Sequence, residues 1–122
     1  MLKIIKSFLA AVLLSVCLVV SAGSAELIML EQDGCAWCDR WNEEVGDAYH
    51  LTVEGKRAPL RRVNIHTKLP ADLAHLKTGH FTPTFILLEG EREIGRIRGY
   101  PGEDFFWGLL SELLKTLPPS SG

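Results

Sequence analysis

The chain has 122 residues, of which 47% are hydrophobic, and this length predicts a single domain with one core. Its 13 basic and 15 acidic residues give a net charge of −2. An acidic balance argues against nucleic acid as a partner, so we expect none.

Residues 1–25 differ in composition from the rest of the chain. Lys3 and Lys6 precede an apolar run over residues 8–20, and small residues follow just before Glu26. This is the pattern of a secretory signal peptide. The alternative is a membrane anchor, but the run is shorter than the ~20 residues that span a bilayer. We therefore expect cleavage before Glu26 and export to the periplasm.

Cleavage would change both the charge and the cysteine content of the chain. All acidic residues follow residue 25, so the mature chain would carry 11 basic and 15 acidic side chains, a net charge of −4. Cys17 would be removed, which leaves only Cys35 and Cys38. An even pair of cysteines in an oxidising compartment is expected to alternate between a dithiol and one local disulfide.

The two cysteines lie where a strand is expected to give way to a helix. The apolar run Leu27–Leu30 predicts a strand that is buried on both faces. The sequence Asp-Gly-Cys-Ala-Trp-Cys then occupies residues 33–38. Apolar residues that recur at intervals of three and four predict an amphipathic helix to about His50; they are Trp37, Cys38, Trp41, Val45, Ala48 and Tyr49.

This position suggests different chemical roles for the two thiols. The first turn of a helix has unpaired N–H groups and a partial positive charge, which favour a thiolate and lower its pKa. Cys35 is therefore the candidate nucleophile. Cys38 shares the inward face with Trp41 and is the candidate resolving thiol. Trp37, between them, is expected to be partly exposed, with a substrate contact or tuning of the redox potential weighed against simple packing.

The middle of the chain contains fewer signals. Residues 52–59 are polar, include Gly and Pro, and predict a loop. Residues 60–65 predict a strand whose charges favour a sheet edge, with Arg61 and Arg62 solvated or, alternatively, in a docking contact. Residues 71–77 follow a proline and predict a short helix that ends at a glycine.

The last third predicts a hairpin and a helix. Residues 80–89 predict an apolar strand with Pro83 near its start, where a proline usually marks a special backbone such as a cis bond. Residues 92–98 predict the returning strand, with a bulge at Gly95. A helix is expected over residues 103–117, with one apolar face made of Phe106, Leu109, Leu110, Leu113 and Leu117. Four aromatic residues are expected in the core: Trp41, Phe85, Phe105 and Phe106.

The order β-α-β-α-β-β-α, with Cys-x-x-Cys after the first strand, Phe-Thr-Pro-Thr at residues 81–84 and Gly99 after the hairpin, resembles the thioredoxin superfamily over residues 27–117. The resemblance implies an α/β thioredoxin-like fold, with a four-stranded mixed sheet flanked by helices. It also implies that a cis-proline loop lies beside the nucleophilic thiol and binds the substrate backbone. That role would fall on Thr82 and Pro83. We expect the domain to cover residues 26–117 and residues 118–122 to form a disordered tail.

Three segments resemble one branch of that superfamily more closely, the periplasmic thioredoxins of sulfur-oxidation (Sox) systems: residues 34–41, 59–63 and 95–107. This implies a thiol–disulfide reductase that needs no cofactor, keeps the cysteine of a Sox sulfur-carrier protein reduced, and receives electrons from a membrane protein. Thioredoxin has a buried acid six residues before its first cysteine, where this chain has Met29. Proton transfer from Cys38 would then use Glu31, water or no specific group.

Other functions remain open at this level. The same motif occurs in disulfide-forming and disulfide-isomerising proteins, and an inert scaffold is a further alternative. The two cysteines with His75 and His80 would make a metal-binding module of a different class. About 36 residues separate Cys38 from His75, more than in common zinc modules, so we expect no metal. His66 and His75 are expected to be ordinary surface residues, whereas His80 is close enough to Pro83 in sequence to touch the active site.

Overall fold

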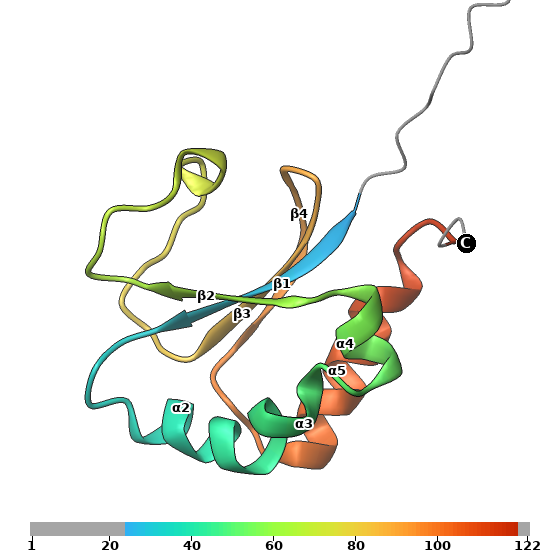
Figure 1. Ribbon diagram of the computed structural model, residues 1–122, viewed down its shortest axis with the longest axis horizontal. Helices are drawn as coiled ribbons and strands as arrows, with labels where there is room; N and C mark the ends of the chain where they lie inside the picture. Colours follow the sequence, from blue (N-terminus) through green and yellow to red (C-terminus); the bar gives the residue numbers. More distant parts are fainter. Residues whose placement is uncertain (1–23, 120–122) are drawn as a thin grey trace, which may run out of the picture.

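The computed structural model describes residues 24–119 (Figure 1). The expected signal peptide lies outside these residues except for Ser24 and Ala25, and the expected tail lies outside them beyond Pro119. Within the described range, no helix combines the length and the apolar character needed to cross a membrane.

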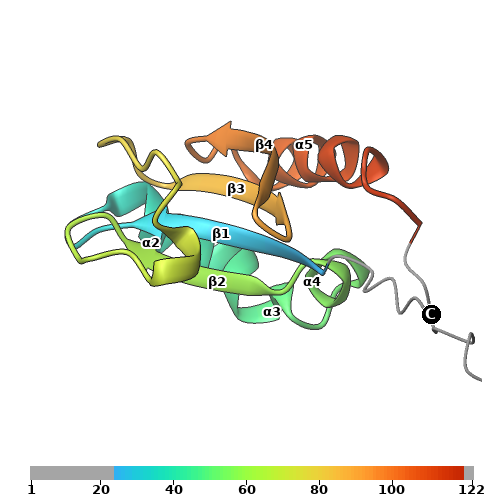
Figure 2. The same ribbon diagram turned by 90° about the horizontal axis from the view of Figure 1, so that it is seen from above.

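Four strands form one mixed sheet. They are β1 (Ala25–Glu31), β2 (Leu60–Asn64), β3 (Thr84–Glu89) and β4 (Arg92–Arg98), in the order β2-β1-β3-β4. The pair β1–β2 is parallel, and the pairs β1–β3 and β3–β4 are antiparallel. This agrees with the expected mixed sheet, with β2 at one edge (Figure 2).

The two central strands are buried on both faces. All residues of β1 from Leu27 to Leu30 have no exposed area, and residues 84–88 of β3 are buried as well. Because both faces are covered, these strands read as continuous apolar runs, as predicted. In β4, Ile94 has no partner between Gly95 and Glu93, so the expected bulge is present.

Helices cover one face of the sheet. They are α2 (Ala36–Trp41), a π-helical segment η2 (Asn42–Gly46), α3 (Asp47–Tyr49) and α5 (Glu103–Lys115). The first three form one continuous helical stretch that ends close to the predicted His50. The opposite face is covered by the segment that contains the 3₁₀ turn η3 (Ala71–Leu73) (Figure 1).

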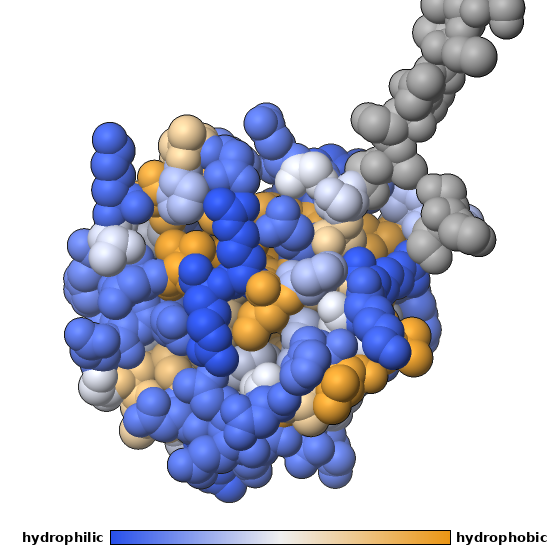
Figure 3. Space-filling model, viewed as in Figure 1, coloured by the Kyte–Doolittle hydropathy of each residue, from blue (hydrophilic) through white to orange (hydrophobic). Residues whose placement is uncertain are grey.

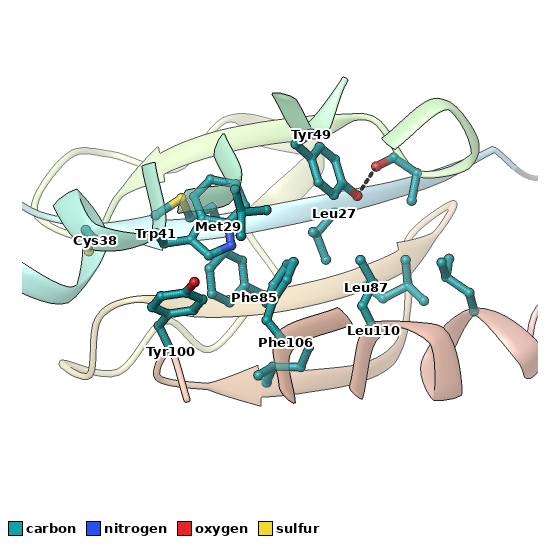
Figure 4. Packing of buried hydrophobic residues seen from close by; sticks show 14 of the residues in the cluster. Leu27, Met29, Cys38, Trp41, Tyr49, Phe85, Leu87, Tyr100, Phe106 and Leu110 are labelled. Atoms are coloured by element: carbon teal, nitrogen blue, oxygen red, sulfur yellow. Dashed lines mark hydrogen bonds between the residues drawn. The ribbon is translucent and has the colours of Figure 1, made fainter. Parts of the chain in front are cut away.

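The core under the helices is aromatic. Trp41 lies at its centre, with its ring centroid 5.0 Å from that of Phe85, 5.7 Å from that of Phe106 and 6.1 Å from that of Tyr49 (Figure 4). The core on the other face is aliphatic, and its buried residues are Ile28, Leu30, Val63, Leu73, Leu76, Ile86 and Leu88. The outer surface in the view of Figure 3 is mostly hydrophilic, with small separate hydrophobic areas.

The predicted loop over residues 52–59 is wrong, because it contains the helix α4 (Val53–Arg57). The hydroxyl of Thr52 accepts a hydrogen bond from the N–H of Gly55 at 2.9 Å and donates one to the carbonyl of Tyr49 at 2.6 Å. A Cβ on Gly55 would lie 1.8 Å from that carbonyl oxygen. The helix thus depends on a cap and a close backbone contact, neither of which produces hydrophobic periodicity.

The predicted helix over residues 71–77 is also wrong, because only the single turn η3 forms. Its hydrogen bonds join residues three apart, as between the N–H of Leu73 and the carbonyl of Pro70 at 2.9 Å. The side chain of Asp72 binds Arg61. Burial of Leu73 and Leu76 against the sheet therefore favours a tight turn over an α-helix.

The buried stripe of α5 differs in part from the predicted one. Phe106 and Leu117 are buried as expected, together with Leu110 and with Leu114, which the prediction omitted. Leu109 is 45% exposed, and Leu113 is half-buried against Gly95. The prediction that Phe105 is a core residue is wrong, since its side chain is 72% exposed. Ala48 of α3 is likewise exposed. Residues four apart share a helix face, so a small rotation exposes one leucine row and buries the next.

Candidate active site

The start of α2 is built around Cys35. Gly34 has φ of +73°, which turns the chain out of β1, and Cys35 has an extended backbone and stands at the N-cap. The Cys35 sulfur accepts a hydrogen bond from the N–H of Cys38 at 3.1 Å, and its carbonyl accepts one from Asp39 at 3.1 Å. The sulfur thus occupies the place of the usual oxygen cap and faces the unpaired N–H groups of the first turn.

Cys35 and Cys38 form a disulfide. Their burial differs: Cys35 is half-buried, whereas Cys38 is 3% exposed. Cys38 belongs to the aromatic core beside Met29 and Trp41 (Figure 4). Solvent and a partner protein therefore reach Cys35 more readily than Cys38.

The loop before β3 forms a second part of the site. The peptide bond between Thr82 and Pro83 is cis. The carbonyl of Pro83 accepts a hydrogen bond from the N–H of Gly99 at 2.7 Å, which ties this loop to the end of β4. Gly99 has φ of +85°, and a Cβ there would lie 3.2 Å from the ring of Phe81. A residue without a side chain is therefore required at this junction.

These segments enclose a cleft of about 260 Å³. Its lining residues are Trp37, Phe81, Thr82, Pro83, Arg98, Gly99, Tyr100 and Pro101. The structure thus brings together the three residues suggested for substrate binding, namely Trp37, Thr82 and Pro83. Trp37 is 53% exposed and connects the cleft to the cysteine motif. The cysteines themselves do not line the cleft, nor does His80, which is exposed.

A hydrogen-bond chain that the sequence did not suggest holds Thr82. Gln32, just after β1, donates from its amide to the hydroxyl of Thr82 at 2.7 Å. The amide oxygen of Gln32 accepts a bond from the ring of His66 at 2.8 Å. Fifty residues separate Gln32 from Thr82 in sequence. The only signal in the sequence was a polar residue at the end of a buried strand, which does not identify its partner.

The side chain of Arg62 lies beside Met29 and binds two polar groups next to it. Its guanidinium donates to the carboxylate of Glu31 at 2.7 Å and to the side-chain oxygen of Asn42 at 2.8 Å. It also lies 3.5 Å from the sulfur of Met29 and 5.8 Å from the ring centroid of Trp41. Glu31 is thus paired with Arg62, and position 29 carries no acid.

Arg61, also on the edge strand, is paired as well. It binds Asp72 through two hydrogen bonds of 2.6 and 2.9 Å. These bonds lower the pKa of the Asp72 carboxyl below its ordinary value. Both arginines lie at a partly exposed sheet edge, as predicted, and each binds carboxylates of the same chain.

Tyr100 forms part of the cleft wall and also reaches the aromatic core (Figure 4). Its side chain is 6% exposed, and its hydroxyl has no hydrogen-bond partner within residues 24–119. Burial, followed by the nearby Glu44 carboxylate, raises the pKa of Tyr100 to about 12. The hydroxyl therefore stays protonated at neutral pH.

Three of the four groups of the alternative metal site, Cys35, Cys38 and His75, have other partners in the structure. The ring of His75 donates to the carbonyl of Glu91 at 2.6 Å, at the β3–β4 turn, and the two cysteines are bonded to each other. In the part of the chain that is described, no group of three or more His, Cys, Asp or Glu side chains is arranged to hold a metal ion.

Comparison with known structures identifies the fold. The chain is 46% identical to the periplasmic thioredoxin SoxS from Paracoccus pantotrophus, solved in its reduced form, over 75% of this chain and 97% of that one, with a TM-score of 0.70. Two other similar structures are thioredoxin-2 of the malaria parasite and a thioredoxin-like protein from Clostridium perfringens. Each is 20% identical, and their TM-scores are 0.57 and 0.56. They cover 74% and 84% of this chain and 84% and 81% of their own.

Neither a model of a protein family nor a curated protein matches the chain. The 46% identity nevertheless extends over 97% of the SoxS structure, and this chain has a four-stranded mixed sheet and a Cys35–Cys38 disulfide. The chain therefore belongs to the thioredoxin superfamily and is a thioredoxin-like thiol–disulfide oxidoreductase.

Proposed function

We propose that this protein is a periplasmic reductase in which Cys35 attacks the substrate and Cys38 releases it. The difference in burial between the two cysteines carries this assignment. A thiolate at Cys35 would be stabilised at the helix start, where the N–H of Cys38 already points at its sulfur. The buried Cys38 is shielded from a partner protein but lies within bonding reach of Cys35.

The reaction proceeds in two exchanges. The Cys35 thiolate attacks one sulfur of a substrate disulfide, so that a mixed disulfide forms and the other substrate sulfur leaves as a thiolate. Cys38 then loses its proton and attacks the Cys35 sulfur. This forms the Cys35–Cys38 disulfide and releases the second substrate thiolate. Two electrons pass to the substrate, whose thiolates take up protons from solvent.

Proton loss from Cys38 has no assigned protein base. Position 29 is occupied by the fully buried Met29, and Glu31 is bound to Arg62. We propose that water takes this proton during exchange.

Trp37, Thr82 and Pro83 are the proposed substrate contacts. They line one cleft, and Trp37 lies in the same turn as the cysteines. Gln32 holds the side chain of Thr82, and the Gly99 N–H holds the carbonyl of Pro83, so the loop has a defined position before a partner binds. Such preorganisation reduces the entropic cost of binding.

We propose that the substrate is a disulfide formed by the cysteine of a Sox sulfur-carrier protein, which the reaction returns to the thiol form. The 46% identity to SoxS supports this proposal. Residues 1–25 would direct export, with the domain over residues 26–117 acting in the periplasm. Because that compartment is oxidising, a membrane protein that passes electrons from the cytosol must restore the dithiol after each turnover.

A trapping experiment tests the roles of the cysteines. Cys38→Ser should accumulate a mixed disulfide between Cys35 and the substrate, because the resolving thiol is missing. Cys35→Ser should form no adduct and show no turnover. The adducts are measured on non-reducing gels and identified by mass spectrometry. Recovery of adducts from Cys35→Ser instead would reverse the assignment.

Alkylation in intact cells tests the direction of electron flow. The cysteine pair should be mostly reduced in cells that contain the membrane donor and oxidised in cells that lack it. A pair that is oxidised in both strains would identify a disulfide-forming protein. The redox state is measured from the mass added by the alkylating reagent.

A further inference from the structure

We infer that Arg98 makes the cleft selective for substrates with an acidic residue next to the reactive cysteine. The proposal extends the proposed reductase function and rests on it. The occupant is an extended segment of a partner protein, with an apolar side chain in the cleft and a carboxylate against Arg98.

Arg98 ends β4 and lines the cleft. Its guanidinium lies over the ring of Phe81, with the central carbon 5.3 Å from the ring centroid. Stacking on an aromatic face leaves the N–H donors at the edge of the guanidinium free to bind a carboxylate with two parallel bonds. The ring thus positions the charge without neutralising it.

Arg98 differs from the other arginines within residues 24–119. Each of the others donates a hydrogen bond to a carboxylate or a carbonyl of the chain; they are Arg40, Arg57, Arg61, Arg62, Arg92 and Arg96. Among the described residues, the guanidinium of Arg98 has no carboxylate within 4 Å and donates no hydrogen bond, and it lies over the Phe81 ring. Among the arginines of the described residues, Arg98 is therefore the one whose guanidinium has no polar partner in the chain.

The cleft contains no opposing acid. Arg98 is the only charged residue among those that line it. The aromatic residues at its edges, Trp37 and Phe81, are each 53% exposed. Arg40 lies over the Trp37 ring at 5.3 Å but is paired with Glu44. An apolar cleft with one unpaired guanidinium complements an apolar side chain beside a carboxylate, and it disfavours a cationic neighbour.

Matched disulfide peptides test this inference. Each carries one cysteine in a mixed disulfide with a neutral thiol, and the residue beside the cysteine is Glu, Gln or Lys. The second-order rate constant for oxidation of the reduced protein is measured with each peptide. The ratio of the Glu rate to the Gln rate is the readout. Arg98→Gln lacks the guanidinium, so its ratio of Glu to Gln rates shows how far the peptide's charge changes the rate without Arg98.

The wild-type ratio should exceed the Arg98→Gln ratio about three- to tenfold, as expected for a partly exposed ion pair at the rim of an interface. Arg98→Glu should favour the Lys peptide. The wild-type excess should shrink as salt is added, because exposed charges are screened.

Arg92→Gln is the control. It removes an exposed arginine from the start of the same strand, about 20 Å from Arg98 at 3.3 Å per residue, and should keep the wild-type ratio. Thermal unfolding of each variant checks that it is folded, and Arg98→Lys, which keeps the charge, should retain part of the excess. If wild type and Arg98→Gln both reduce all the peptide disulfides and give equal ratios, the role of Arg98 is contradicted while the reductase function stands. A wild-type protein that reduces none of the peptides would contradict the reductase function itself.

Discussion

The active site has two sides that are built in different ways. The side that carries the chemistry is one continuous stretch, residues 34–41, where a strand ends and a helix begins over the aromatic core. The side with the proposed recognition role joins two distant segments, residues 81–83 and 98–101, through the bond between Gly99 and Pro83. Reactivity is therefore a local property of this chain. The cleft exists only after β3 and β4 have paired.

The two sides also differ in how their buried tyrosines are satisfied. On the chemistry side, the hydroxyl of Tyr49 donates to the carbonyl of Ala58 at 2.7 Å and joins the end of the first helical stretch to the start of β2 (Figure 4). On the recognition side, the hydroxyl of Tyr100 has no partner among residues 24–119. Buried polar groups without partners cost stability. Of the two tyrosine hydroxyls, the one on the chemistry side is therefore expected to contribute more to stability.

The largest expected effect comes from removing the support of the chemistry side. Trp41→Ala should lower the free energy of unfolding by about 3–5 kcal/mol, because it leaves a cavity among Phe85, Phe106 and Tyr49. Denaturant titration measures this loss. Phe105→Ala is the control, since that ring is 72% exposed, and should cost about 0.5 kcal/mol or less. Equal losses in the two variants would show that the aromatic core does not support the helix start.

The next effect would separate recognition from chemistry. Gly99→Ala forces a side chain into a backbone of φ +85° and pushes on the Phe81 ring, 3.2 Å from the added Cβ. The strain costs about 1–2 kcal/mol. The substrate KM should rise more than kcat falls, as steady-state kinetics with a protein substrate would show. Gly90→Ala is matched in strain, with φ of +60°, but meets nothing within 4 Å, so it should change stability alone. A fall in kcat without a change in KM for Gly99→Ala would assign this wall to the chemistry.

The smallest effect compares the two tyrosines. Tyr49→Phe leaves the carbonyl of Ala58 without its partner and should lower the free energy of unfolding by about 1–2 kcal/mol. Tyr100→Phe removes a hydroxyl that has no partner and should leave stability unchanged or slightly higher. Both are measured by denaturant titration under one set of conditions. A loss in Tyr100→Phe as large as that in Tyr49→Phe would mean that the Tyr100 hydroxyl is satisfied in solution.

Much of the fold could be predicted because its signals are local. The apolar run Leu27–Leu30 predicts a central strand, and the bulge at Gly95 follows from a break in alternation; both are confirmed. The errors lie where tertiary contacts override propensity. The helix α4 depends on the Thr52 cap and on Gly55 lying against the Tyr49 carbonyl. Adjacent leucines make the buried face of α5 ambiguous in sequence. The apolar spacing predicts a buried Leu109 and omits Leu114, whereas the structure exposes Leu109 and buries Leu114.

By itself, the sequence determined the redox pair and its position, because two cysteines three residues apart at a strand-to-helix junction need only the geometry of one helical turn. It also suggested Trp37, Thr82 and Pro83, through position and resemblance. Tertiary structure alone decided that Gln32 holds Thr82 and that Arg98 meets Phe81 beside Tyr100. These contacts join residues that strand pairing and chain crossover bring together. Side-chain partners of this kind leave no periodic or spacing signal in the chain.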